Sequence, residues 1–180
     1  MLLTACSTAP AVVDLSDSVY KPSSPNEGDQ YSVSFVKILN KADGGRNALR
    51  LHKPTRETVE EDLKRFLADT LPVKKTAPRS LQVTISKAES YWLYEGAATI
   101  PIIGILFIDA DFEFGINLRV LFEIEQNSKV VSSYLFDERV TIQGKAATPD
   151  NIRESYKKVI AEYRKRFFGE LETNFLNRYF

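Results

Sequence analysis

The sequence has little of the residue chemistry that most metal and redox sites use, because it contains one cysteine, Cys6, and one histidine, His52. A single cysteine excludes an internal disulfide and any cysteine-rich metal site, and a single histidine excludes the common zinc constellations. Lysine plus arginine number 24 and aspartate plus glutamate also number 24, so no net charge draws the chain to nucleic acid. We therefore expect no metal, no cofactor and no nucleic-acid partner.

Long apolar runs are also missing, since no stretch reaches the roughly 18 to 20 apolar residues that a membrane-spanning helix requires. The chain does have enough hydrophobic material for a core, because 43% of its 180 residues are hydrophobic and 27% are charged. That length suits one well-buried core better than two. We predict a single globular domain over residues 31–180 that does not itself cross a membrane.

The segment around Cys6 favours a lipid attachment site. Leu3-Thr4-Ala5-Cys6 matches the lipobox of bacterial lipoproteins, in which small residues expose the bond to a signal peptidase and the thiol receives a lipid. An export signal also has a positive region and an apolar region of about 7 to 15 residues, of which Met1 and Leu2 are the only trace here. We interpret residues 1–5 as a signal-peptide remnant and Cys6 as the lipidated, palmitate-bearing residue; an accidental thiol on a disordered tail is the alternative.

The residues that follow Cys6 have the composition of a flexible tether. Residues 7–30 read STAPAVVDLSDSVYKPSSPNEGDQ, rich in Ser, Pro, Asp and Ala and without sustained periodicity. A coil of these 24 residues spans roughly 25 to 30 Å between its ends. The alternative is an added edge strand that packs on the domain through its apolar residues, namely Val12, Val13, Leu15, Val19 and Tyr20.

From residue 31 onward, hydrophobic periodicity predicts regular elements. Alternation predicts strands at 31–39, 79–94, 109–125 and 129–142, and residues 48–53 could add a short one. Spacings of three and four predict amphipathic helices at 55–71 and from 148 to the C-terminus, with the capping residue Thr148 before Pro149. The first helix has two equal start signals, Thr55 and the capping box at 58–61. The order strand, helix, three strands, helix predicts an α+β two-layer sandwich, with two helices on one face of an antiparallel sheet of about four strands.

These features resemble the YajG-type bacterial lipoproteins. The resemblance rests on the lipobox, the tether, the KADGGR stretch at 41–46, the helix ETVEEDLKRFLADTL, the strand SLQVTISKAES and the hairpin FGINLRVLFEIEQNSKVVSSYLFDERV. In looser outline the chain also resembles auxiliary lipoproteins of lipid-transport ABC systems. The resemblance covers roughly residues 31–175. It implies a domain anchored in the outer membrane of a Gram-negative envelope, facing the periplasm, without established catalysis.

An apolar segment, GAATIPIIGILFI at 96–108, is the most unusual part of the chain. Nine of its thirteen residues are apolar, and Pro101 and Gly104 interrupt any helix. It is predicted either to fill the core as a buried connection or to form an apolar tip that meets acyl chains, a lipid ligand or a partner protein. The candidate contact residues are Ile100, Ile102, Ile103, Ile105, Leu106 and Phe107.

Candidate catalytic groups are few. Asp109, Asp111 and Glu113 alternate along an extended chain, about 6.5 to 7 Å from neighbour to neighbour, which loosely suits a glycoside-hydrolysing pair. They also lie where the solvent face of the strand must be polar, and this is the favoured interpretation. His52 lies in no nucleophile elbow, phosphate loop or zinc motif, and is predicted to be a surface residue.

The basic groups of the last helix are predicted to form helix-stabilising pairs. Basic residues at 157–158 and 164–166 interleave with Glu154, Glu162 and Glu170, as helix-stabilising pairs do. Lys74, Lys75 and Arg79 suit either a solvated loop or contact with anionic headgroups. The function predicted from the sequence is a lipid-anchored binding or adaptor domain that is not an enzyme, joined to the membrane through Cys6. A lipid-binding component of a transport system and an envelope hydrolase using Asp109, Asp111 and Glu113 are the alternatives, and the oligomeric state stays open.

Overall fold

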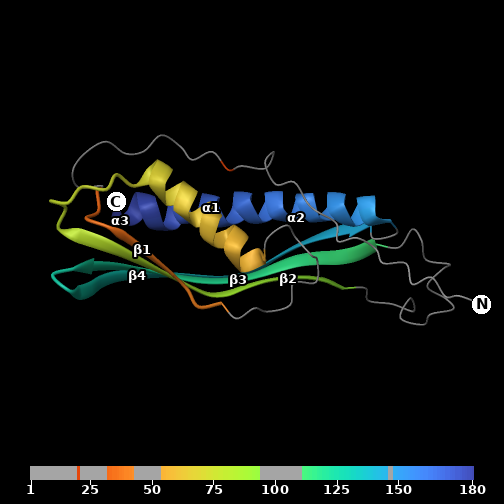
Figure 1. Cartoon of the computed structure of the whole chain (residues 1–180), viewed down its shortest axis with the longest axis horizontal. Coiled ribbons are helices and arrows are strands. Elements are labelled where there is room, and N and C mark those ends of the chain that lie inside the picture. Colours follow the sequence, from red (N-terminus) through yellow and green to blue (C-terminus); the bar gives the residue numbers. More distant parts are fainter. Residues whose placement is uncertain (1–19, 21–31, 43–53, 94–110, 146–147) are drawn as a thin grey trace, which may run out of the picture.

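The computed structural model describes residues 20, 32–42, 54–93, 111–145 and 148–180 (Figure 1). Their elements follow the predicted order: β1 (Val36–Asn40), α1 (Thr55–Thr70), β2 (Arg79–Leu93), β3 (Asp111–Gln126), β4 (Lys129–Lys145), α2 (Pro149–Glu170), the π-helical segment η5 (Leu171–Leu176) and α3 (Asn177–Tyr179). Several predictions lie outside the described residues, namely those for residues 1–5, Cys6, His52, the 96–108 segment and Asp109.

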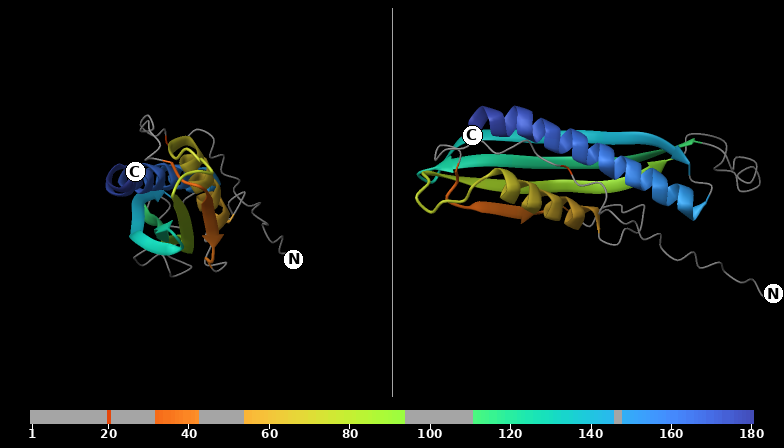
Figure 2. Two further views of the ribbon diagram at one scale, coloured as in Figure 1. Left: turned by 90° about the vertical axis from the view of Figure 1, so that its left-hand side faces the viewer. Right: turned by 90° about the horizontal axis from the view of Figure 1, so that it is seen from above.

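The two helices lie on one face of a four-stranded sheet, which confirms the two-layer α+β fold (Figure 1). Figure 2 shows α2 running along the length of the strands. The strand order is β1-β2-β3-β4, and β2–β3 and β3–β4 pair antiparallel. The expectation of a wholly antiparallel sheet is wrong at one edge, because β1 pairs parallel with β2. The reason is that α1 connects these strands as a crossover and returns the chain to the end from which β1 began.

The hairpin of β3 and β4 is the longest pairing in the sheet and is closed by a two-residue turn. Its register runs from Asp111↔Lys145 to Gln126↔Lys129. Asn127 and Ser128 have φ angles of 53° and 59°, as a turn that matches the twist of the flanking strands requires. The predicted hairpin is confirmed, and β4 continues to Lys145, beyond its predicted end at residue 142.

The core lies between the sheet and the helices, and the predicted alternation of β3 is confirmed. From Phe114 onward, the residues of β3 that face the helices are at most 1% exposed: Phe114, Ile116, Leu118, Val120, Phe122 and Ile124. The predicted stripe of α1 is buried as well, at Val59, Leu63, Phe66, Leu67 and Leu71. In β2 the register shifts between Ile85 and Lys87, so Ala88 and Ser90 take over the inward positions after Ile85.

The helix starts agree with the sequence signals at α2 but not at α1. Thr148 caps α2, since its Oγ1 accepts a hydrogen bond from Asn151 N at 3.1 Å. Neither predicted cap of α1 is used, and Pro54 occupies the N-cap position without a side-chain bond. Thr55 is buried and donates to Ser90 Oγ at 3.0 Å instead. Tertiary contact with β2 therefore overrides local capping at this position.

The C-terminal helix contains a π-helical segment that the periodicity did not predict as such. Tyr163, Phe167, Leu171, Phe175 and Tyr179 recur every four residues, and in a regular α-helix each four-residue step drifts by about 40° around the axis. The wider turn of η5 counteracts this drift. Leu171 and Phe175 consequently stay fully buried. The unbroken run of fours is the signal in the sequence.

Candidate functional site

Of the predicted carboxylates, Glu113 is the one whose side chain is described, and it belongs to a surface cluster. Its carboxylate forms an ion pair with Arg139 and accepts a hydrogen bond from Tyr91 Oη at 3.2 Å. Arg139 lies over the Tyr91 ring, with its Cζ 4.8 Å from the ring centroid. Gly115 makes room for this ring, since an added Cβ would lie 2.2 Å from Tyr91 Cζ. The carboxylate therefore joins β2, β3 and β4 on the sheet surface.

Metal ligation and membrane crossing find no support in the described parts of the chain. Among residues 20, 32–42, 54–93, 111–145 and 148–180, no three His, Cys, Asp or Glu side chains gather as metal ligands would. Within the same residues, no helix combines the length and apolar character needed to cross a membrane.

The sheet face turned away from the helices, here called the open face, has a mostly apolar row of three leucines and one threonine across its four strands. The register aligns Leu39 with Thr84, Thr84 with Leu121, and Leu121 with Leu135. Leu135 is 48% exposed. Strand rise and spacing give this face roughly 750 Å², close to the roughly 800 Å² per partner of a standard protein interface.

Charges beside this row are paired with one another on the same face. Arg119 lies 3.4 Å from Asp137, and Lys87 lies 3.5 Å from Glu89. Because both partners are half-exposed, each pair stabilises the fold by about 1 kcal/mol at most. The open face thus presents an apolar centre and locally compensated charge.

A second apolar feature, here called the edge groove, lies where β1 forms an edge of the described sheet beside α1. It has a volume of about 250 Å³ and is lined by Val36, Ile38, Glu60, Lys64, Leu67, Ala68 and Val73. Glu60 forms the polar rim, since it accepts hydrogen bonds from Lys64 at 2.5 Å and from Asn40 at 2.9 Å. These bonds lower the pKa of Glu60. The groove is smaller than the roughly 300 to 1,000 Å³ of most ligand sites, and suits one apolar side chain or the end of an acyl chain.

A third feature joins the predicted tether to the helices through Tyr20. The Tyr20 ring lies 5.8 Å from Phe66 of α1 and 5.7 Å from Phe168 of α2, measured between ring centroids. Its hydroxyl donates to Glu172 Oε2 at 2.6 Å. Burial, together with the neighbouring carboxylate, raises the pKa of Tyr20 to about 12. The phenol therefore stays neutral and able to donate at physiological pH.

The residues around Tyr20 define a small recess between the helices, here called the Tyr20 slot. It is lined by Asp62, Arg65, Phe66, Asp69, Arg164 and Phe168. The edge-strand alternative placed Tyr20 beside the sheet, whereas the structure places it against both helices. An isolated aromatic residue within a polar segment is the signal that the sequence offered for this contact.

Below the slot, Asp62 and Arg164 form a buried ion pair that joins α1 to α2. Arg164 donates from Nε to Asp62 Oδ2 and from Nη2 to Asp62 Oδ1, each at 2.8 Å. The two side chains are 6% and 7% exposed. Burial raises the pKa of Asp62, and the hydrogen bonds from Arg164 oppose that rise. Arg164, predicted among the helix-stabilising pairs of its own helix, instead pairs with α1, because the tertiary fold turns this position of α2 towards α1.

Among the other basic groups, one has the partner predicted within its helix and two have partners in other elements. Lys158 pairs with Glu154 at 2.9 Å, as predicted within the helix. Arg166 instead pairs with Glu138 of β4 at 3.2 Å. Arg79 donates to the Tyr179 carbonyl at 2.7 Å, so it joins the start of β2 to the C-terminus and is not part of a solvated loop.

Comparison with known proteins gives similarity to solved bacterial structures. The chain is similar to a protein of family DUF330 from Xanthomonas campestris, with 10% identity, a TM-score of 0.47, and coverage of 93% of this chain and 95% of that chain. It is also similar to rare lipoprotein B from Shewanella oneidensis (12% identity, TM-score 0.43, 80% and 95% covered) and to a minor lipoprotein from Acinetobacter baumannii (13% identity, TM-score 0.42, 78% and 94% covered).

No family model matches the chain, and no curated protein matches it. Membership of the YajG-type family therefore stays a prediction from the residues.

Proposed function

We propose that this protein is a lipid-anchored domain of the Gram-negative envelope, attached to the outer membrane through Cys6 and facing the periplasm, where it binds a partner without catalysing a reaction. The observation that carries the proposal is the lipobox Leu3-Thr4-Ala5-Cys6 followed by a polar segment and one folded domain. A lipid on Cys6 would hold that domain at a membrane surface.

The described surfaces support binding rather than catalysis. Glu113 is held by Arg139 and Tyr91 as part of a sheet-surface cluster. Exposed apolar side chains, by contrast, occur on the open face and at the edge groove, where Leu135 is 48% and Val73 is 60% exposed. Apolar surface of this kind is typical of contact sites.

Attachment of the lipid is tested by metabolic labelling. The gene, together with the codons upstream of Met1, is expressed in a Gram-negative host that is fed a radioactive fatty acid. We expect label on the wild-type protein and complete loss of label in Cys6→Ala, because the thiol is the acceptor. Ser7→Ala is the matched control and should keep its label. Equal labelling of wild type and Cys6→Ala would contradict the proposal.

A second function, binding of an acyl chain as in a transport component, is favoured by the edge groove. Its floor is formed by aliphatic side chains of β1 and α1, Val36, Ile38, Leu67 and Ala68. A chain end that filled this groove would be removed from water, and each buried methylene is worth about 0.8 kcal/mol. Lys64 at the rim already pairs with Glu60, so binding would depend on the apolar floor and not on charge.

The groove is tested with a fluorescent fatty acid, cis-parinaric acid. Ala68 lines the groove and is exposed, so Ala68→Phe should fill it and weaken binding roughly tenfold, which corresponds to about 1.4 kcal/mol. Ala161→Phe, at an exposed position of α2 outside the groove, is the matched control and should bind as the wild type does. The proposal fails if the wild type shows no saturable binding or if both variants weaken it equally.

A further inference from the structure

The Tyr20 contact shortens the chain that links Cys6 to the folded domain. Fourteen positions separate Cys6 from Tyr20, and twenty-six separate Cys6 from Ser32, where the described domain resumes. A flexible chain of fourteen residues spans roughly 19 to 22 Å on average and about 50 Å when fully extended. With Tyr20 bound in its slot, the distance from the lipid to the folded domain is therefore set by fourteen residues instead of twenty-six.

The attachment point lies on the helix layer. Tyr20 contacts Phe66 and Phe168, which belong to the two helices, and its hydroxyl bonds to Glu172 in η5. Arg65 and Asp69, which line the same slot, are exposed on α1. Because the helices cover one face of the sheet (Figure 1), the slot opens on the opposite side of the molecule from the open face.

From these positions we propose that the Tyr20 contact orients the domain at the membrane, with the helix layer towards the bilayer and the open face of the sheet away from it. A helix layer of about 10 to 12 Å on a sheet layer of similar depth makes the domain roughly 20 Å thick. A fourteen-residue chain that starts at the slot would need most of its average span merely to pass around that thickness. The inverted orientation is therefore disfavoured.

Charge does not provide this orientation, because α1 and α2 together carry nine basic and nine acidic side chains. A helix layer without net charge is not attracted to anionic headgroups as a polybasic surface is. The length of the attached chain and the position of Tyr20 are thus the features that distinguish the two faces. The consequence is that the apolar row through Leu121 and Leu135 is presented to partners in the periplasm.

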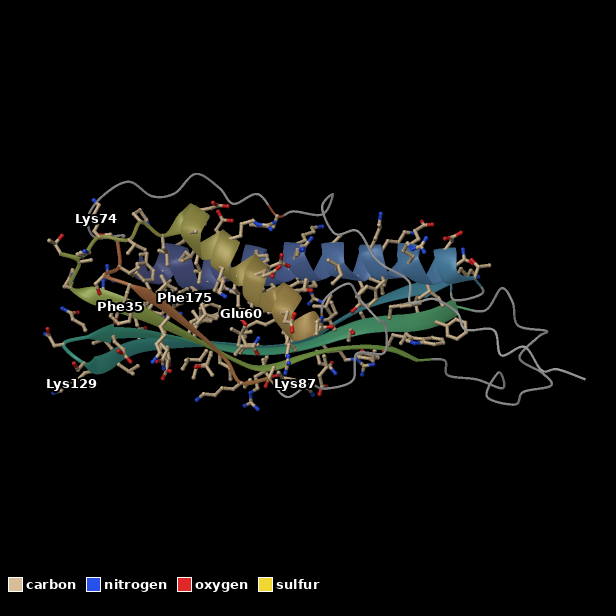
Figure 3. All side chains as sticks on the ribbon, in the orientation of Figure 1. Phe35, Glu60, Lys74, Lys87, Lys129 and Phe175 are labelled. Atoms are coloured by element: carbon tan, nitrogen blue, oxygen red, sulfur yellow. The ribbon has the colours of Figure 1, made fainter. Side chains whose placement is uncertain are left out.

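The proposal rests on the proposed function, since it needs an anchor at Cys6, but it is tested without native lipidation. Cys6 is the only thiol in the chain, so it can be coupled to phosphatidylcholine vesicles that contain a maleimide-bearing phosphatidylethanolamine. Lysine acetylation is then followed by peptide mass spectrometry. Lys158 and Lys165 report on the exposed side of α2, and Lys87 and Lys129 report on the sheet side (Figure 3).

In the wild-type protein we expect acetylation of Lys158 and Lys165 to become roughly threefold slower on the vesicle than in solution, while Lys87 and Lys129 keep their rates. In Tyr20→Ala this difference between the faces should disappear, because the free chain of twenty-six residues reaches either face. Tyr91→Phe, which alters a tyrosine on the open face, is the matched control and should keep the wild-type pattern.

A second variant leaves every described residue unchanged and so cannot fail through misfolding of the domain. Insertion of a twelve-residue Gly-Ser linker after Pro10 lengthens the chain before Tyr20 to roughly 25 to 31 Å on average, and should also abolish the difference. The proposal is overturned if acetylation slows equally on the helix side and the sheet side of the wild-type protein. It is also overturned if Tyr20→Ala or the linker variant keeps the wild-type difference. If the protein is not acylated in cells, the fatty-acid labelling test fails. The lysine pattern on maleimide vesicles does not depend on that acylation and would be unchanged.

Discussion

Replacing Arg164 with methionine is expected to lower the free energy of unfolding by about 3 to 5 kcal/mol. Arg164 makes two hydrogen bonds of 2.8 Å to Asp62, and both side chains are almost fully buried. The variant therefore leaves a carboxylate in the contact between α1 and α2 without the guanidinium that compensates its charge. Urea unfolding followed by circular dichroism measures the loss.

Two controls separate the buried charge from the loss of packing. The double variant Asp62→Leu with Arg164→Met should recover most of the stability, because a well-packed apolar pair removes both charges together. Arg166→Met breaks an exposed pair with Glu138, whose side chains are 43% and 35% exposed, and should cost about 1 kcal/mol or less. A double variant no more stable than Arg164→Met would contradict the assignment.

The stability lost in Arg164→Met should change with pH. Burial raises the pKa of Asp62 above its ordinary value of 3.8, and removal of Arg164 takes away the contact that opposes this rise. A group whose folded-state pKa is raised gives stability that is present below the unfolded value and is lost as the pH rises through the folded value. The difference between Arg164→Met and wild type should consequently be smaller at acidic than at neutral pH.

Replacing Phe167 with alanine is expected to destabilise the fold by about 3 to 5 kcal/mol, because it opens a cavity in the centre of the core. Phe167 is fully buried. Its ring lies 4.7 Å from Phe136 of β4, 6.3 Å from Phe122 of β3 and 5.0 Å from Phe168, measured between ring centroids. One side chain of α2 thus holds the helix on the two longest strands.

The matched control is Phe35→Ala, which removes the same side chain from a position that is 51% exposed. Its expected cost is about 0.5 kcal/mol or less, as is usual for surface substitutions. Both variants are compared with wild type by urea unfolding at one pH. Similar losses in the two variants would show that Phe167 does not occupy the central position that the fold assigns to it.

Most of the secondary structure follows from local sequence. Strict alternation along β3 predicted which side chains face the core, and Phe114 and Phe122 are indeed buried. Thr148 and Pro149 marked the start of α2, because a side-chain cap and a proline at the first position act through neighbours in the chain. The parallel pairing of β1 was also implicit in the order strand, helix, strand, because a crossover helix joins parallel strands.

The candidate surfaces were less predictable, since each depends on residues far apart in the chain. Asp62 and Arg164 are 102 positions apart, and Tyr20 and Glu172 are 152 apart. Local periodicity predicted helix-stabilising pairs for Arg164 and a tether for Tyr20, and it gave no prediction for Asp62. The edge groove needs both β1 and α1, and the row from Leu39 to Leu135 needs the register of four strands.

By itself, the sequence determined the order and type of the elements, the core faces of β3 and α1, and the cap of α2, because these follow from the periods of strand and helix and from contacts between near neighbours. It also determined the lipobox on which the proposed anchor rests. Tertiary structure alone decided which charges are buried, where Tyr20 binds, and that both described helices pack on the same face of the sheet. Those properties arise when α1 and α2 pack side by side on one face, and no short-range pattern specifies that packing.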